Sequence, residues 1–283
     1  MQLKPAPLFQ SRIGLGTWLM GEDTSKAKQE CKAIEHALAI GYRLIDTAEM
    51  YADGAAESIV GQALGAFASS RREEVTLISK VLPHHADKHG TIKACEASLR
   101  RMRCDYLDHY LLHWQGSQPE ESTIEGFLAL QERGLIRYFG VSNFNQSALL
   151  SWLKAGRNVG LESACSSNQI YYALSERGIE FDLVPAMTER GIALIAYSPL
   201  GTGNLTKHPA LSSLATMHGY SAAQLALAWV LRNPNAVVIP KSVHEDRITE
   251  NWQAGGIQLS ETILTKLDQL FKPPTHATPL AII

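Results

Sequence analysis

The chain alternates between strand-like and helix-like segments, and this alternation constrains the fold more than any other feature. Short apolar runs such as 43–48 and 75–81 are each followed by a segment with apolar residues at a helical spacing, such as 56–67 and 91–102. The alternation repeats eight times between residues 12 and 253. The sequence therefore predicts a series of βα units over most of its length.

Near-continuous apolar strands that alternate with helices predict a parallel sheet covered by helices. Eight such units favour closure into a (β/α)8 TIM barrel, with an open doubly wound sheet as the alternative. The expected strands span 12–18, 43–48, 75–81, 106–113, 136–143, 163–171, 192–200 and 236–242. The expected helices span 28–41, 56–67, 91–102, 122–134, 146–156, 181–191, 221–233 and 245–253.

We expect an α/β fold that forms a single domain over residues 1–283. No linker rich in Pro, Gly or Ser and no low-complexity stretch divides the series. A further helix is predicted over 259–271, after the eighth unit. Residues 272–283 form a C-terminal tail, whose prolines favour an extended path over the surface.

Polar residues end several of the apolar strands. Asp46 ends the second, Lys80 lies at the end of the third, His113 ends the fourth, and Tyr51 lies in the loop that follows Asp46. Since active sites of such barrels lie at the carboxyl ends of the strands, these four residues could converge on one rim. Other roles stay open: Asp46 could cap a turn, Lys80 could be solvated, and His113 could be a hydrogen-bonded core histidine.

Composition and charge exclude several classes of protein. The net charge is −2 and the pI is about 6.6, so no basic field would attract nucleic acid or an anionic membrane surface. The first ten residues resemble no targeting segment, and no run reaches the roughly 18 apolar residues of a membrane span. The four cysteines, Cys31, Cys95, Cys104 and Cys165, show no CxxC spacing. A cytoplasmic protein with reduced thiols is expected.

Two short motifs imitate functional sites. The histidine-rich segment "HHADKH", 84–89, lies in a loop without the cysteines and carboxylates of a metal centre, so no metal is expected. The segment "GLGTWLMG", 14–21, has two glycines of a dinucleotide fingerprint and lacks the third at the required spacing. Neither segment therefore indicates a site on its own.

Seven motifs occur in an order that resembles the aldo-keto reductase superfamily, from about Gly14 to Phe271. They are "GYRLIDTAEMY", "ISKV", "LLHW", "GVSNF", "NQIYY", "AYSPLG" and "IPKSVHEDRITEN". The resemblance implies a barrel that binds NADPH or NADP+ in an extended form without a Rossmann domain. It also implies a catalytic tetrad of Asp46, Tyr51, Lys80 and His113.

The tetrad that the resemblance implies suits the reduction of a carbonyl group. Tyr51 would donate a proton to the carbonyl oxygen, and Lys80 would make its phenol more acidic. Asp46 would orient Lys80, and His113 would hold the substrate oxygen. Trp18 and Trp114, together with Tyr51 and His113, would form the substrate pocket.

The resemblance also implies a set of cofactor-binding residues. Ser142, Asn143 and Gln169 would hold the nicotinamide carboxamide, and Tyr197 would stack on its ring. Lys241, Ser242 and Arg247 would bind the adenosine 2'-phosphate. The complete set is Gly16, Thr17, Trp18, Asp46, Ser142, Asn143, Gln169, Tyr197, Ser198, Leu200, Gly201, Lys241, Ser242, Arg247, Glu250 and Asn251.

Three positions depart from the family pattern. His244 replaces the small hydroxyl residue expected beside the phosphate, Gln115 replaces a proline after Trp114, and the segment 51–57 is longer than the compact Tyr-x-Asn-Glu form. The last two lie near the expected substrate entrance and bear on specificity.

The expected function is NADPH-dependent reduction of small aldehydes or keto-aldehydes, with most similarity to bacterial family members that reduce methylglyoxal. A reductase of diketo-sugar acids is one alternative. A cofactor-binding sensor or channel-associated subunit with the same fold is another. The expected partner is a small carbonyl compound, with neither nucleic acid nor membrane, and we expect a monomer.

Overall fold

The computed structural model describes residues 8–67 and 69–283. Residues 1–7, which include part of the segment searched for a targeting signal, lie outside the described residues. Within the described part, eight strands form one sheet in chain order, and every neighbouring pair is parallel. They are β1 (Leu15–Gly16), β2 (Leu44–Asp46), β3 (Thr76–Val81), β4 (Leu107–Leu112), β5 (Ile136–Ser142), β6 (Ser167–Tyr171), β7 (Ala193–Tyr197) and β8 (Ala236–Val238).

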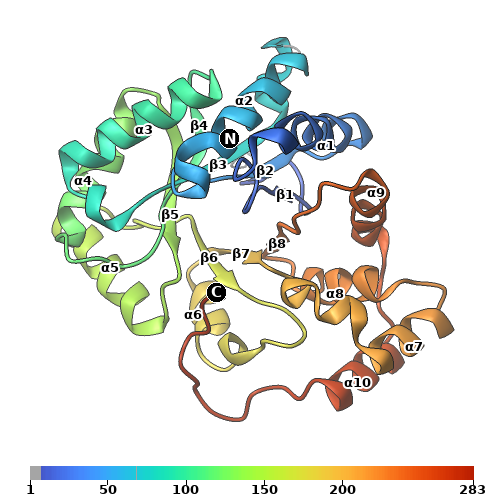
Figure 1. The fold of residues 1–283 in the computed structure, drawn as a ribbon. Helices are drawn as coiled ribbons and strands as arrows, with labels where there is room; N and C mark the ends of the chain where they lie inside the picture. Colours follow the sequence, from blue (N-terminus) through green and yellow to red (C-terminus); the bar gives the residue numbers. More distant parts are fainter. Residues whose placement is uncertain (1–7, 68) are drawn as a thin grey trace, which may run out of the picture.

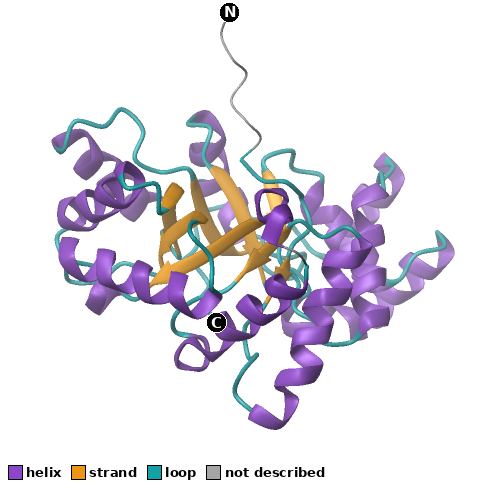
Figure 2. Ribbon diagram, turned by 90° about the horizontal axis from the view of Figure 1, so that it is seen from above, coloured by secondary structure: helices purple, strands orange, loops and turns teal. Residues whose placement is uncertain are grey.

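The sheet closes on itself between its first and last strands. Ile13 pairs in parallel with Val238, the Gly14 amide donates to the Val238 carbonyl at 2.8 Å, and the Val238 amide donates to the Arg12 carbonyl at 3.0 Å. The strands lie at the centre of the molecule with the helices around them (Figures 1 and 2). The predicted (β/α)8 barrel is confirmed, and the open sheet is excluded.

In the described residues, helices follow the strands as the sequence predicts, with one addition, α7. The Asp87 side chain caps α3 by accepting from the Gly90 amide at 2.7 Å, and α1 is followed directly by Gly41, whose φ is 117°. The helices are α1 (Ala27–Ile40), α2 (Ala55–Ala66), α3 (Lys88–Met102), α4 (Glu120–Glu132), α5 (Gln146–Asn158), α6 (Leu183–Glu189), α7 (Pro209–Met217), α8 (Ala222–Leu231), α9 (Glu245–Gln253) and α10 (Glu261–Leu270).

Helix α7 was not predicted from the sequence. Pro209 occupies its first turn, and the Nδ1 atom of His208 accepts a hydrogen bond from the Leu211 amide at 3.2 Å. Proline is well suited to the first turn of a helix, where an amide donor would lack a partner. Strand β7 is therefore followed by two helices, α7 and α8.

Among residues 8–67 and 69–283, none of the helices has the length and apolar character that a membrane span requires.

Several strands are shorter than predicted, and two of them end where the backbone turns. The predicted strand 236–242 ends at Val238, and Asn143 and Ser198, just beyond β5 and β7, have φ values of 59° and 46°. Non-glycine residues rarely adopt such a conformation. These turns follow β5 and β7 directly, and both residues line the cavity at the strand ends.

The interior of the barrel is filled by apolar side chains, so the cavity at the strand ends has a closed floor. The buried cluster inside the barrel consists of Leu44, Ile78, Leu111, Ile195, Val237 and Ile239. A second and larger apolar core lies between the strands and the surrounding helices.

The C-terminal tail runs from α10 back to the barrel, where the chain ends near its centre (Figure 1). The buried Arg177 side chain anchors the start of this path by donating to the Asp268 carboxylate at 2.7 Å and to the Phe271 carbonyl at 2.5 Å. The last residue, Ile283, lines the cavity at the barrel mouth. The tail therefore contributes to the wall of that cavity.

Candidate active site

The carboxyl ends of β2 and β3 place Asp46, Lys80 and Tyr51 in direct contact. The Lys80 ammonium is fully buried and donates to Asp46 Oδ2 at 2.8 Å, to the Thr47 carbonyl at 2.8 Å and to the Tyr51 hydroxyl at 3.1 Å. An ammonium group has three N–H donors, so all the donors of Lys80 are satisfied. The arrangement fixes the Tyr51 oxygen and leaves its own proton free for another acceptor.

A tight turn brings Tyr51 back over the end of β2. The Tyr51 amide donates to the Ala48 carbonyl at 3.1 Å, and the next two residues, Ala52 and Asp53, have φ values of 48° and 50°. Gly54 follows with φ of 85°, and a Cβ atom there would overlap the Arg101 side chain of α3. The longer form of this segment thus packs against α3.

Burial and the charges of the neighbouring groups together set the pKa values of these three groups. Burial raises the pKa of Tyr51, and the Lys80 ammonium opposes this rise without cancelling it. Burial would lower the pKa of Lys80, but Asp46 and Tyr51 outweigh burial and raise it. Burial also raises the pKa of Asp46, against the effect of Lys80. The sequence led us to expect a more acidic Tyr51; in the structure burial is the larger effect, and the hydroxyl stays protonated at neutral pH.

His113 lies directly after β4 and faces Tyr51, with the two ring centroids 5.8 Å apart in an edge-on arrangement. Burial, with a smaller contribution from Lys80, lowers the pKa of His113 to about 2. Its Nδ1 atom is buried and has no hydrogen-bond partner among the described residues. His113 is therefore a neutral imidazole at physiological pH.

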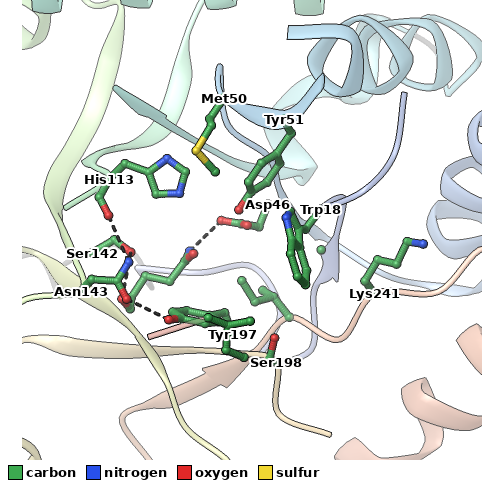
Figure 3. Close-up of a pocket in the computed structure, with 14 residues that line it drawn as sticks. Trp18, Asp46, Met50, Tyr51, His113, Ser142, Asn143, Tyr197, Ser198 and Lys241 are labelled. Carbon is green, nitrogen blue, oxygen red and sulfur yellow. Dashed lines mark hydrogen bonds between the residues drawn. The ribbon is translucent and has the colours of Figure 1, made fainter. Parts of the chain in front are cut away.

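Side-chain amides from β5 and β6 connect this cluster to the opposite wall (Figure 3). The Gln169 amide nitrogen donates to Asp46 Oδ1 at 2.7 Å. The Tyr197 hydroxyl donates to Asn143 Oδ1 at 2.9 Å, and the Asn143 amide nitrogen donates to the His113 carbonyl at 3.2 Å. Asp46 thus accepts from Lys80 through one oxygen and from Gln169 through the other, a link that the sequence did not indicate.

A small cavity of about 110 Å3 opens at the Tyr51 hydroxyl and His113. Part of its wall is apolar, and three of the apolar residues, Met50, Ile239 and Ile283, were not predicted from the sequence. The full lining is Gly16, Trp18, Asp46, Met50, Tyr51, His113, Ser142, Asn143, Gln169, Tyr197, Ser198, Ile239, Lys241 and Ile283.

A larger cleft of about 820 Å3 continues from the cavity between the loops that follow β7 and β8. Trp18, Ser198 and Lys241 line both spaces. Eleven of the lining residues were not named from the sequence, among them Leu19, Lys207 and Val243. The lining comprises Trp18, Leu19, Ser198, Pro199, Leu200, Thr202, Gly203, Thr206, Lys207, Ser221, Ala222, Ala223, Pro240, Lys241, Ser242, Val243, His244, Arg247, Glu250 and Asn251.

Three cationic side chains line this cleft without an anionic partner. Lys207, Lys241 and Arg247 form no ion pair among the described residues. Lys241 and Arg247 lie on either side of the turn that starts α9, whereas Lys207 comes from the loop after β7. The cleft is therefore suited to a ligand with several negative charges. Among the described residues, no cluster of His, Cys, Asp or Glu could hold a metal ion.

Comparison with known proteins identifies the family. The sequence profile of the aldo/keto reductase family matches residues 12–272. The chain belongs to the aldo/keto reductase family. The resemblance that the seven motifs indicated is therefore confirmed.

Bacterial aldo/keto reductases are similar to this one over almost its whole length. The methylglyoxal reductase YeaE of Escherichia coli K12 is 41% identical over 277 residues, covering 96% of this chain and 94% of the relative. The glyoxal reductase of Bacillus subtilis is 34% identical over 261 residues, covering 92% and 88%. A crystal structure of an aldo-keto reductase from Klebsiella pneumoniae in complex with NADPH superimposes with a TM-score of 0.91, at 39% identity and with all of both chains covered.

Four residues named from the resemblance line neither space in this aldo/keto reductase, and one of them is the fully buried Lys80. The Thr17 hydroxyl donates to the Asp46 carbonyl at 3.0 Å, behind the site. Gly201 is buried and shapes a turn, with φ of 59°, so its neighbours line the cleft instead. Trp114 packs against the His113 ring at 4.9 Å between centroids and stays 37% exposed. The apolar wall expected from Trp114 is supplied by Met50 and Ile283.

Proposed function

We propose that this protein is an NADPH-dependent reductase of small aldehydes and keto-aldehydes of the methylglyoxal type. One observation carries the proposal: a fully satisfied Lys80 holds the protonated Tyr51 hydroxyl beside the neutral His113, at the wall of a small cavity. Such an arrangement can deliver a proton to an oxygen bound in the cavity. The names of the Escherichia coli and Bacillus subtilis relatives, methylglyoxal reductase and glyoxal reductase, support this substrate class.

The residues present fit a dinucleotide phosphate cofactor. Amide groups of Asn143 and Gln169 lie at the small cavity, and the unpaired cations Lys207, Lys241 and Arg247 lie along the adjoining cleft. A nicotinamide carboxamide needs hydrogen-bonding groups, and phosphates need cations, so the two ends of the ligand match the two ends of the site. The Klebsiella pneumoniae relative was crystallised with NADPH, which supports the assignment. When bound, NADPH supplies the hydride for the carbonyl carbon.

The chain's own residues supply the proton and the orientation. Tyr51 donates its proton to the carbonyl oxygen as negative charge develops there, and the Lys80 ammonium stabilises the resulting phenolate. Asp46 holds Lys80 and compensates its buried charge. His113, as a neutral imidazole, donates a hydrogen bond to the substrate oxygen and orients it. Tyr51 then regains its proton from solvent, so the site returns to its initial state.

Substrate size provides a test of the substrate class. Because the cavity beside Tyr51 is small, we expect higher kcat/KM for dicarbonyls of two to four carbons and for small aromatic aldehydes than for steroid ketones. Steady-state rates with NADPH and a panel of carbonyl compounds would measure this order. A steroid ketone or a diketo-sugar acid that is reduced more efficiently than methylglyoxal would overturn the proposed substrate class.

Cofactor choice is tested by Arg247→Ala. A charge-assisted hydrogen bond to phosphate corresponds to about 10-fold or more in affinity, so the variant should raise KM for NADPH by about 10-fold and leave KM for NADH nearly unchanged. The kcat with NADPH should stay within about three-fold, because the phosphate is remote from the reacting carbon. Arg157→Ala on α5, an exposed arginine that lines neither space, is the matched control. Equal losses with the two cofactors would contradict the assignment of Arg247.

A further inference from the structure

We propose that Glu49 is a positioning residue for the wall of the substrate cavity. Its carboxylate ties the segment after β2 to the loop after β3 and so holds Met50 against the cavity, where Met50 selects for small carbonyl compounds. This inference rests on the proposed function in one respect, that a carbonyl compound is reduced in that cavity. Glu49 lines neither the cavity nor the cleft, so it acts through its neighbour.

The Glu49 carboxylate extends the pairing between β2 and β3 beyond the end of β2. The Thr47 amide donates to the Ile78 carbonyl at 2.9 Å, and the Glu49 amide continues the series to the Lys80 carbonyl at 3.5 Å. The Leu82 amide then donates to Glu49 Oε1 at 2.7 Å. In a continued parallel ladder that amide would donate to the Glu49 carbonyl. The side chain therefore takes over an acceptor role of the backbone.

The environment of the carboxylate shows that this contact is well enclosed. The Glu49 side chain is only 9% exposed, and a carboxylate so far from water needs hydrogen-bond donors. His85 Nδ1 lies 3.1 Å from the same oxygen that accepts from Leu82, on a side chain that is 47% exposed. Exposed pairs of this kind contribute little, so the Leu82 amide is the principal partner. The segment 84–89, which the sequence left without a role, supplies the second contact.

The loop after β3 is a firm anchor because it is itself held by the next unit of the barrel. The Thr123 hydroxyl of α4 donates to the Ala86 carbonyl. A Cβ atom at Gly116 would overlap Pro83, so the loops after β3 and β4 lie in close contact. A bond from Glu49 to this loop therefore connects the segment after β2 to a braced part of the structure.

Met50 depends on such a connection. Its side chain points into the cavity (Figure 3) and is nevertheless 38% exposed. Methionine is unbranched and flexible, so its place in the wall depends on its backbone. That backbone is held on one side by the Tyr51 amide, which donates to the Ala48 carbonyl at 3.1 Å, and on the other by Glu49. Loss of the Glu49 contact would release one side of Met50 and leave the Tyr51 hydroxyl on Lys80.

The expected consequence is a change in selectivity for substrate size. A gap of about one methylene group in an apolar pocket corresponds to about 10-fold in kcat/KM. A small dicarbonyl loses its contact with Met50 when the wall moves, whereas a bulky aldehyde gains room. The proton donor keeps its place, so the loss for the small substrate should be mainly in KM.

The experiment measures kcat and KM for methylglyoxal and for naphthaldehyde, with NADPH, in the wild type and in variants at Glu49. In Glu49→Ala the ratio of kcat/KM for methylglyoxal to that for naphthaldehyde should fall about 10-fold, with kcat for methylglyoxal within about three-fold. The dissociation constant for NADPH should stay within about two-fold of the wild type. Glu49→Gln keeps a side-chain oxygen for the Leu82 amide and should keep the ratio within about three-fold.

A double-variant cycle tests whether Glu49 acts through Met50. Met50→Ala should lower the same ratio, and adding Glu49→Ala to it should change the ratio by less than about two-fold, because both changes affect one side chain. If Glu49→Ala does not fold, Glu49→Asp takes its place. It keeps the carboxylate and is one methylene too short for the Leu82 amide, so the ratio should fall by about three-fold or more.

Asp87→Ala is the matched control in the same loop. It removes the cap of α3, which accepts from the Gly90 amide at 2.7 Å, and leaves the Glu49 contacts in place. This variant should lower the midpoint of denaturant unfolding and leave the substrate ratio unchanged.

The inference and the proposed function can fail separately. An unchanged ratio in the folded Glu49→Ala or Glu49→Asp variant, or effects that add fully to those of Met50→Ala, would show that Glu49 only stabilises the loop. A loss in Glu49→Gln as large as in Glu49→Ala would contradict the role of the bond to Leu82. In each of these cases the proposed function stands. If the wild type oxidises NADPH with no carbonyl compound, the proposed function is wrong and the inference fails with it.

Discussion

Replacing Tyr51 by phenylalanine is expected to lower kcat for methylglyoxal by about 10²–10⁴-fold, the usual contribution of a general acid. The Tyr51 hydroxyl lines the cavity and accepts a hydrogen bond from Lys80 at 3.1 Å, so its proton is available to a substrate oxygen. The phenylalanine ring keeps the same packing, so the dissociation constant for NADPH should stay within about three-fold. Single-turnover and binding measurements would separate the two effects.

Tyr106→Phe is the matched control for this experiment. Tyr106 lies just before β4, at the opposite end of the barrel from the site, and its hydroxyl has no hydrogen-bond partner among the described residues. This variant should keep wild-type turnover. If Tyr51→Phe also turns over methylglyoxal at the wild-type rate, Tyr51 is not the proton donor.

Lys80→Met is expected to damage both catalysis and stability. Without the ammonium, the phenol of Tyr51 loses the group that limits the rise of its pKa and stabilises the phenolate. We expect a loss of about 100-fold or more in kcat. The buried Asp46 carboxylate would also lose its charge partner, which costs about 3–5 kcal/mol in the free energy of unfolding. Denaturant unfolding and steady-state kinetics measure the two quantities.

The double variant Asp46→Asn with Lys80→Met distinguishes the catalytic role from the structural one. Removing both charges of a buried pair is much less destabilising than removing one. The double variant should therefore recover most of the lost stability and none of the lost activity. Recovery of both would show that Lys80 acts only by supporting the fold.

The barrel was predictable because its signal is repeated. Each unit has an apolar strand followed by an amphipathic helix, and eight repetitions outweigh an error in any one of them. The strand-end residues Asp46, Lys80 and His113 were predictable for a related reason, since polar residues in buried strands need a partner or a function. In the structure Asp46 and His113 line one cavity with Tyr51, and Lys80 contacts both Asp46 and Tyr51.

Other features depend on three-dimensional contacts that no local pattern reveals. The hydrogen bond from Gln169 to Asp46 joins residues that are 123 positions apart in the sequence. Ile283 lines the cavity, and Arg177 anchors the start of the tail at Asp268 and Phe271, a path that the sequence of the tail does not specify. The raised pKa of Tyr51 depends on the depth of burial, which the motif does not encode.

Helix α7 was missed for a different reason. Its signal was present in the sequence, because Pro209 followed by an apolar segment is typical of a helix start. Residues 201–220, between the seventh predicted strand and the next predicted helix, were assigned no element, and α7 occupies part of this gap.

We propose that the cluster of Asp46, Lys80, Tyr51 and His113 reduces a carbonyl compound, with NADPH as the hydride donor. The most direct test mixes the purified wild-type protein with NADPH and methylglyoxal and follows the loss of NADPH absorbance together with the hydroxycarbonyl product. We predict one equivalent of product for each NADPH oxidised, and almost no oxidation in Tyr51→Phe. Tight binding of NADPH without its oxidation by any carbonyl compound of the panel would contradict the claim and favour a cofactor-binding sensor.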